Sequence, residues 1–342
     1  MTVAVMAILA VLAAAAAGAR IAHGRSAPFT TVAALSPHIA LLALVAAVVS
    51  IAVTGWPGLI VGVPAALLVA WQLPVRRPRE RPAPQQEQAD TEIRIVSINA
   101  LVGRASPAAI LAESEAFNAD LLVVQELTPE LAAPLAQGLA ELLPYSNLHP
   151  SPGSGGIGVW SRWPLTELSP VPETKTLMPR VRVQRQWPVI LTPVHTAAPV
   201  TSRHSAWQHD FAQLLSAVAT TTGHQLVVGD FNASRDHQAF RKLLSAGLAD
   251  CADIASSRPW PGFTWPADRR YPPIIRLDHI LVSQPGAMVR QARTIRVPGT
   301  DHLGVLAVID LLPLPGARTE ARRDIDEDAS AGLNETADQD AT

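Results

Sequence analysis

Long apolar runs dominate the N-terminal part of the chain. Three of them, residues 3–17, 39–54 and 56–73, come before the first acidic residue, Glu80. A helix needs about 20 apolar residues to cross a bilayer, and each run approaches that length. Ala, Leu and Val on every face leave no solvent-facing side, which favours membrane helices over core helices. The pattern predicts a transmembrane region of three helices over residues 1–75; the alternative for residues 1–17 is a cleaved signal peptide.

Arginines flank these runs and set the expected orientation. Arg20 and Arg25 follow the first run, and residues 76–81 hold four more arginines after the third. Two crossings separate the two clusters, so both lie on one side, which the positive-inside rule makes cytoplasmic. We therefore expect a multi-pass protein of the cell membrane whose larger, C-terminal part lies in the cytoplasm. Residues 76–91 have the composition of a basic, Pro-rich linker.

From residue 92 onward, short apolar runs alternate with segments of helical spacing. Strands are predicted at residues 93–98, 121–124, 157–160, 189–194, 226–228, 280–282, 294–297 and 305–311, and helices at 107–117, 129–143, 202–220 and 237–244. This alternation predicts an α/β domain over residues 92–312 in which helices cover sheets. Residues 313–342 are acidic and rich in small side chains, without apolar periodicity, and predict a disordered tail.

Composition narrows the function classes. Of the 342 residues, 48% are hydrophobic and 16% are charged, which leaves ample material for a core and excludes a disordered chain. Because Cys251 is the single cysteine, an intrachain disulfide and a cysteine-based structural zinc site are both excluded. The net charge of −2 gives the whole chain no electrostatic signature of nucleic-acid binding.

Polar residues recur where the predicted strands begin or end. They are Asn99, Glu126, His195, Asp230, Asn232, Asp278, Asp301 and His302. Strand ends are where sheets build their sites, and Mg²⁺ takes oxygen ligands from one or two carboxylates. Glu126 and Asp301 could supply these carboxylates, which leaves the other Asp and His residues for acid–base work and phosphate contact. Each residue alone also fits a turn or a helix cap, so the prediction depends on their order and spacing together.

That ordered set resembles the endonuclease/exonuclease/phosphatase family, which includes DNase I-like nucleases. The matching segments are IRIVSINA, DLLVVQEL, GGIGVWSRWPL, PVHTAAP, VVGDFNAS, IRLDHILVS and GTDHLGVLAVI. The resemblance implies a four-layer α/β sandwich, two mixed β-sheets flanked by helices, for residues 92–312. It also implies a metal ligand at Glu126, with Asn99 and Asp301 beside the metal. The metal it implies is Mg²⁺, with Mn²⁺ as a second candidate.

The resemblance further implies five catalytic residues. Asp230 and Asn232 match the pair that orients the attacking water and the phosphate. Asp278 matches the aspartate that pairs with the final catalytic histidine, His302. His195 matches a histidine that contacts the scissile phosphate in several branches of the family.

Together these features predict a membrane-anchored, Mg²⁺-dependent phosphohydrolase that cleaves phosphoester bonds by metal-assisted attack of water. Its substrate is left open between nucleic acid and a phospholipid-like or small phosphoester. The lipid bilayer is expected as a partner of the N-terminal helices, and the sequence indicates no protein partner. The alternatives are a catalytically silent binding domain on a membrane anchor, and a structural or transport protein. The absence of charged residues within the apolar runs argues against a transport pathway.

Overall fold

The structure is a computed structural model that describes residues 18–19, 26–56, 59–60, 63–64, 67, 91–200, 202–255 and 262–314. The predicted membrane run at residues 3–17 lies outside these residues. So do most of the run at 56–73, nearly all of the linker at 76–91 and nearly all of the tail at 313–342. The fold and the candidate site are therefore built from residues 91–314.

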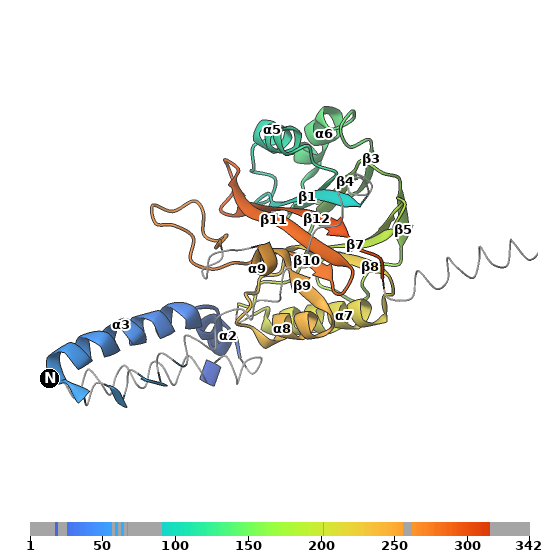
Figure 1. The fold of residues 1–342 in the computed structure, drawn as a ribbon. Coiled ribbons are helices and arrows are strands. Elements are labelled where there is room, and N and C mark those ends of the chain that lie inside the picture. The colour runs from blue at the N-terminus through green and yellow to red at the C-terminus, as the bar shows by residue number, and fades with distance from the viewer. Residues whose placement is uncertain are drawn as a thin grey trace, which may run out of the picture.

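Two six-stranded mixed sheets pack face to face between two layers of helices, as the sequence predicts (Figure 1). The first sheet has the order β11-β12-β1-β2-β4-β3, and the second has the order β5-β6-β7-β8-β10-β9. The strands of the first sheet are β1 (Glu92–Asn99), β2 (Leu121–Gln125), β3 (Tyr145–His149), β4 (Ile157–Ser161), β11 (Ala287–Arg296) and β12 (Leu303–Leu311). Those of the second are β5 (Leu165–Leu168), β6 (Arg180–Val183), β7 (Val189–His195), β8 (His224–Asp230), β9 (Leu248–Asp250) and β10 (Asp278–Ser283).

The period of two along each strand divides the core into layers. On β1, Ile93 and Ile95 face the second sheet, whereas Val96 and Ile98 face the helices outside. On β8, Val228 belongs to the inter-sheet layer and Val227 to the layer beneath the outer helices. Residues that continue the inward-facing series past a strand end therefore lie at the rim of the gap between the sheets.

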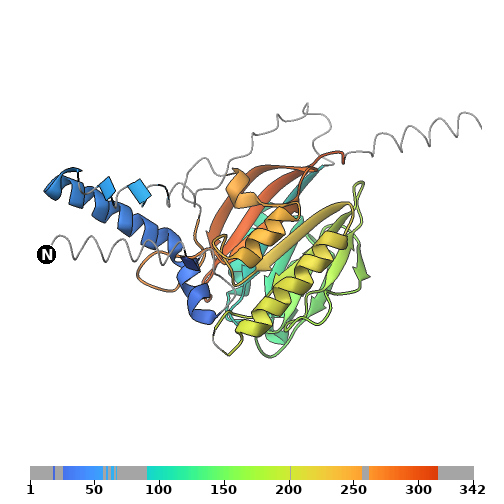
Figure 2. The same ribbon diagram turned by 90° about the horizontal axis from the view of Figure 1, so that it is seen from below.

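Four helices cover the outer faces of the sheets (Figures 1 and 2). They are α5 (Pro107–Phe117), α6 (Pro129–Gly138), α7 (His204–Thr220) and α8 (Gln238–Ser245). The N-cap residues Ser106 and Thr128 accept hydrogen bonds from the backbone N–H groups of Ala109 and Leu131, as helix starts require. Helix α6 ends at Gly138 rather than at the predicted residue 143. Residues 139–142 form a turn, and Leu139 and Leu143 at either end of it still pack into the core.

The strands that the sequence pattern misses are mostly short and lie at or next to sheet edges. Strands β3 and β5 have largely exposed or half-buried side chains, so no apolar alternation marks them. Strand β6 alternates arginine and valine but has only four residues, and the sequence gives no sign of β9 or the five-residue helix α9 (Cys251–Ala255) and finds only the end of β11. These segments depend on neighbours in the sheet rather than on a local pattern.

Two N-terminal helices precede the sandwich, α2 (Ala27–Ala34) and α3 (Ser36–Thr54). Within α3, the stretch Ser36–Val53 has a mean hydropathy of 2.2 over 18 residues and could cross a membrane by length and composition. Among the described residues it is the one helix that passes this test, so the multi-pass arrangement stays a prediction. Leu42, Val45 and Val53 of α3 are exposed, so this helix presents apolar side chains outward.

Candidate active site

One rim of the gap between the sheets gathers the predicted polar residues. Strands β7 and β8 are parallel, and their pairing sets His195 beside Asp230. Strand β10 runs antiparallel to β8, so its first residue, Asp278, pairs with the last residue of β8, Asp230. From the other sheet, Asn99 ends β1 next to the end of β2, and β12 begins at the same rim just after His302. Strand order alone thus brings residues from distant parts of the sequence together.

Asn99 connects the two sheets at this rim. Its Nδ2 donates to Asp230 Oδ2 over 3.0 Å and to Glu126 Oε1 over 3.2 Å. The other carboxylate oxygen of Glu126 accepts from the backbone N–H of Val102 at 2.8 Å. The turn that supplies this N–H has left-handed backbone at Leu101 and Val102, and Glu126 itself has φ 55°. Strained backbone of this kind clusters at functional sites, and here it aims Glu126 at Asn99.

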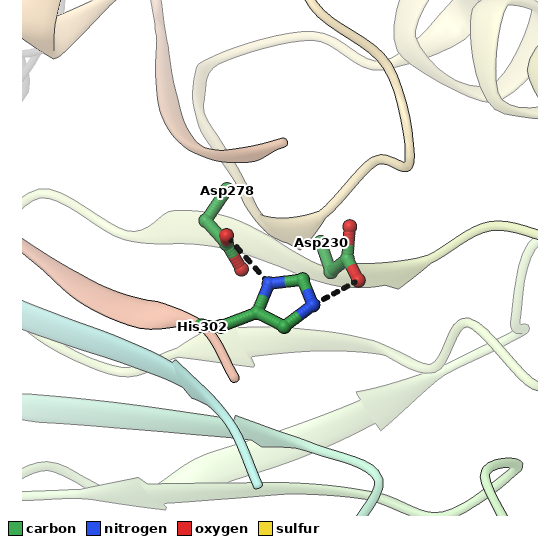
Figure 3. Close-up of side chains that lie close together, drawn as sticks. All are labelled: Asp230, Asp278 and His302. Carbon is green, nitrogen blue, oxygen red and sulfur yellow. Dashed lines mark hydrogen bonds and ion pairs between the residues drawn. The ribbon is translucent and has the colours of Figure 1, made fainter. Parts of the chain in front are cut away.

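His302 and Asp278 form a buried pair on the other side of Asp230. His302 Nδ1 donates to Asp278 Oδ2 over 2.9 Å, and the opposite ring nitrogen, Nε2, lies 3.9 Å from Asp230 Oδ2 (Figure 3). A carboxylate on Nδ1 fixes the tautomer and the plane of the ring. Nε2 therefore points to the same region as the Asp230 carboxylate.

His195 lies between the Glu126 side and the Asp230 side of the site. Its Nε2 is 3.7 Å from Glu126 Oε1 and 3.9 Å from Asp230 Oδ2. Its Nδ1 is buried and makes no hydrogen bond with the described residues. His195 Nε2 is therefore placed to contact a ligand bound between Glu126 and Asp230.

The side chains of Asn232 and Asp301 make their hydrogen bonds to residues other than Asp230. Asn232, at φ 45°, donates its backbone N–H to Asp230 Oδ1 (2.8 Å) and its Nδ2 to the carbonyl of Thr196 (3.0 Å). Asp301 Oδ2 accepts from the indole Nε1 of Trp265 at 3.1 Å, and its Oδ1 is 4.0 Å from His302 Nε2. The structure therefore places Asn99, His195 and His302 next to the Asp230 carboxylate, and Asn232 contacts that carboxylate through its backbone.

Burial and neighbouring charges shift the pKa values of Asp230 and His302 at the rim. Burial raises the pKa of the Asp230 carboxyl, and the neighbouring His302 offsets that rise only in part. Burial acts to lower the pKa of His302, but the Asp278 carboxylate and its hydrogen bond outweigh it, with help from nearby carboxylates, and the pKa rises to about 10. At neutral pH the rim thus holds a protonated histidine next to a carboxyl group that binds protons more readily than a free one.

The donor set at the rim fits a divalent cation. Asp230, Asp278 and His302 each offer a ligand atom, and these atoms lie within 4.8 Å of one another. Asp278 Oδ1 and Asp301 Oδ1 are buried and have no hydrogen-bond partner among the described residues. Buried carboxylate oxygens without a proton donor are costly unless a cation or water satisfies them. Of the predicted ligands, Asn99 lies between Glu126 and Asp230, and Asp301 lies next to His302, so the predicted ligand set adjoins this cluster.

A cleft of about 430 Å³ opens beside the rim. Leu101 and Thr300 line it and also touch Asn99, since Leu101 N–H donates to Asn99 Oδ1 and Thr300 Oγ1 donates to the Asn99 carbonyl. Arg104 and Arg296 line the cleft as well. Two guanidinium groups beside the site suit an anionic substrate.

Sequence reasoning missed the residues that support the site from behind. Trp265, which binds Asp301, lies in a segment without a pattern that would single it out. Thr300 stands in the segment GTDH, but a threonine two residues before His302 is also an ordinary turn residue. The left-handed turn at Leu101 and Val102 carries no glycine at those two positions, so the sequence gives no sign of it.

The comparisons with known proteins agree with this geometry. A sandwich of this kind with acids, amides and histidines at one rim defines a class of phosphoester hydrolases. The sequence model of the endonuclease/exonuclease/phosphatase family matches residues 96–302, and the chain belongs to that family. The matched segment holds all eight predicted site residues. A comparison with curated proteins finds no match.

Solved structures share the fold at low sequence identity. TDP2 from D. rerio, complexed with a single-strand DNA product, is 16% identical with a TM-score of 0.53; the match covers 65% of this chain and all of that one (100%). A functionally unknown protein from Enterococcus faecalis is 14% identical with a TM-score of 0.52, over 64% of this chain and 100% of that one. An endonuclease/exonuclease/phosphatase family protein from Leptotrichia buccalis is 14% identical with a TM-score of 0.50, and the match covers 65% of this chain and 100% of that one. At these identities the likeness concerns the fold alone.

Proposed function

We propose that this protein is a membrane-anchored, Mg²⁺-dependent hydrolase of phosphoester bonds. The observation that carries the proposal is the convergence of Asn99, Glu126, Asp230, Asp278 and His302 at one rim, within a chain of this family. A catalytically silent binding domain would have no need of a buried Asp–His pair aimed at a second buried carboxylate. The arrangement therefore favours catalysis over binding alone.

In the proposed mechanism, Asp230 accepts a proton from the attacking water. Its raised pKa makes it a stronger base than an exposed carboxylate. His302, charged and held by Asp278, donates a hydrogen bond from Nε2 to a phosphoryl oxygen. His195 and Asn232 add donors around the phosphate; in this structure the Asn232 amide is engaged by the Thr196 carbonyl, so its side chain must turn to reach substrate.

We assign the metal to the Glu126 side of the rim, with Asn99 and Asp301 next to it. His302 Nδ1 is already used by Asp278, so that pair serves better as a donor than as a ligand set. When bound there, Mg²⁺ would offset the negative charge that gathers on the phosphate oxygens. The adjoining cluster of Asp230, Asp278 and His302 is the competing assignment for the metal.

For the N-terminal part we propose the multi-pass arrangement of residues 1–75, followed by the linker at 76–91, with the catalytic domain (92–312) and tail (313–342) in the cytoplasm. The apolar, exposed α3 supports one crossing. The orientation can be tested by introducing a cysteine into the tail of the chain and comparing its labelling in intact cells with its labelling in opened cells. Labelling in intact cells would place the domain outside the cytoplasm and overturn that part of the proposal.

The substrate we propose is a phosphodiester, either of nucleic acid or of a lipid. TDP2, which shares the fold, was solved with a DNA product, whereas the apolar α3 favours a substrate at the bilayer. The two differ in their response to salt: nucleic-acid binding weakens steeply as salt rises, and turnover of a lipid follows its surface concentration. A panel of DNA, RNA, sphingomyelin and inositol phosphates at two salt concentrations separates them.

The proposed activity is tested with the full chain in detergent and bis-p-nitrophenyl phosphate as a generic phosphodiester. We expect turnover with Mg²⁺ and none with EDTA. Asp230→Asn should lower kcat by about 10³-fold, since a general base and a buried charge are both lost. Glu141→Gln, on an exposed carboxylate away from the rim, is the matched control and should keep full activity. Equal activity in Asp230→Asn and the control would refute the assignment of the site.

A further inference from the structure

Residues 267–274 form a loop that joins the candidate active site to the apolar N-terminal helix. At its start, the backbone N–H of Ala267 donates to the carbonyl of Asp301 over 2.6 Å. At its end, the carbonyl of Ile274 accepts from His38 Nε2, on α3, over 2.7 Å. One end of the loop is thus fixed to the site and the other to the helix that we propose enters the membrane.

The middle of this loop is exposed and positively charged. Arg269, Arg270 and Tyr271 all face solvent, and Tyr271 is 53% exposed. Arg269 makes an ion pair with Asp268 at 3.2 Å, but both side chains are largely exposed, so the pair leaves the guanidinium available to other anions. Tyrosine is enriched at the headgroup level of membranes, where its ring and hydroxyl meet apolar and polar surroundings, and arginine is attracted to anionic headgroups.

The position of α3 relative to the sandwich is held by a second contact. His237, the N-cap residue of α8, donates from Nε2 to the carbonyl of Thr30 in α2 over 3.0 Å. In both Figure 1 and Figure 2 the loop, drawn in orange, and α3, drawn in blue, project from the same side of the sandwich. A bilayer that holds α3 therefore lies on the side to which the loop points.

We propose that residues 268–272, here named the interface loop, bind the anionic headgroups of the bilayer that holds α3, and so seat the active-site cleft at the membrane surface. The proposal rests on the membrane anchor of the proposed function. Arginine pairs with phosphate groups through two parallel N–H donors, and basic segments next to a membrane helix are attracted to anionic lipids. Because Ala267 and Asp268 also line the cleft beside the rim, lipid contact at the loop brings that cleft to headgroup level.

The position of the interface loop can be measured without any assay of hydrolysis. The single cysteine, Cys251, is buried, so a cysteine introduced at the surface can be labelled selectively. We would label Tyr271→Cys with a fluorescent dye in the full chain, reconstitute it in nanodiscs, and add a lipid that carries a nitroxide quencher on its headgroup. The matched control is Glu167→Cys, exposed on β5 at the far edge of the second sheet.

We expect at least about twofold more quenching of the dye at position 271 than at 167, and more in discs with phosphatidylglycerol than in discs of phosphatidylcholine alone. Arg269→Glu with Arg270→Glu should remove the response to phosphatidylglycerol, whereas Arg182→Glu, exposed on β6, should leave it unchanged. Equal quenching at 271 and 167, or an unchanged response after charge reversal, would overturn the proposal.

Two further outcomes distinguish a failure of the interface loop from a failure of the membrane anchor, and lipid binding from nucleic-acid binding. If the chain fails to co-elute with the discs, the membrane anchor is wrong and the interface loop with it. If single-stranded DNA, but not lipid, changes the signal of the dye at position 271, the loop is a nucleic-acid surface and the lipid proposal is overturned. Hydrolytic activity enters neither measurement, so a failure of catalysis would be seen separately.

Discussion

At the scale of single residues, Asp230 is the side chain that both halves of the site share. It accepts from Asn99 on one side and faces His302 Nε2 on the other. Glu126 lies on the Asn99 side of Asp230, whereas Asp278 pairs with Asp230 across β8 and β10 and holds His302. Substitutions at Glu126 and at Asp278 should therefore have different effects, although both remove a carboxylate.

Asp278→Asn should lower kcat by about 10²- to 10³-fold, because His302 loses the partner that holds its ring and its charge. We expect this variant to bind Mg²⁺ normally in a calorimetric titration. Glu126→Gln, in contrast, should lose Mg²⁺ binding. The reverse outcome, with binding lost in Asp278→Asn and kept in Glu126→Gln, would move the metal to the cluster of Asp230, Asp278 and His302.

A buried ion pair behind the site makes the stability of the protein sensitive to acid. Asp250 is buried against Arg276 and His279; burial acts to raise its pKa, but the Arg276 guanidinium, together with the contacts of the carboxylate to His279 and the backbone N–H of Ala252, outweighs burial and lowers the pKa to about 2. A lowered pKa means that the carboxylate stabilises the fold above the pKa of the unfolded chain, near 4. That stabilisation, roughly 2 kcal/mol, is lost as pH falls from about 4 toward 2.

This pH effect can be isolated by comparing two chains. Urea unfolding of the full chain in detergent, followed by tryptophan fluorescence, should show a larger loss of stability between pH 4.5 and 2.5 than the Asp250→Asn variant shows. The variant should already be less stable at neutral pH, because Arg276 keeps only part of its buried partner charge. Parallel pH dependence in the two chains would contradict the assignment.

At the scale of elements, the close approach of β7 and β8 depends on a glycine. Gly229 has φ 144°, and a Cβ there would lie 2.0 Å from the carbonyl oxygen of Val194 on β7. Because the next residue is Asp230, a shift of β8 would displace the centre of the site. Gly229→Ala should cost at least about 2 kcal/mol of unfolding free energy and lower activity in the folded fraction.

The matched control is Gly153→Ala, where an added Cβ meets no atom within 4 Å and φ is not in the left-handed region. We expect a change below about 0.5 kcal/mol there. Chemical unfolding of both variants tests the comparison. A Gly229→Ala protein as stable and active as the control would show that β7 and β8 can separate without harm to the site.

The central strands and the helices could be predicted from the sequence, because their signals are local. Alternation marks the start of β1, a short apolar run marks β8, and the capping residues Ser106 and Thr128 mark the starts of α5 and α6. The ends of the central strands then point to Asn99 and Asp230 as site residues. Edge strands such as β3 and β5 could not be predicted, since their side chains are exposed or half-buried and do not alternate with a period of two.

At the scale of the whole molecule, the site is a long-range product of topology. Asn99 and Asp230 are 131 residues apart, and their contact exists because the two sheets pack face to face. No local pattern predicts a contact between residues so far apart in the sequence. The sequence therefore yields the residue types of the site but not its centre at Asp230. Nor does it give the loop at residues 267–274, whose connection of site and helix α3 depends on tertiary contacts.

The central claim is that this rim hydrolyses phosphoester bonds with water. The most direct test is a reaction of the full chain with bis-p-nitrophenyl phosphate and Mg²⁺ in ¹⁸O-labelled water, followed by mass spectrometry of both products. We expect the ¹⁸O atom in p-nitrophenyl phosphate and none in p-nitrophenol, with no product in EDTA or from Asp230→Asn. Label in p-nitrophenol, or equal product from wild type and Asp230→Asn, would contradict the account.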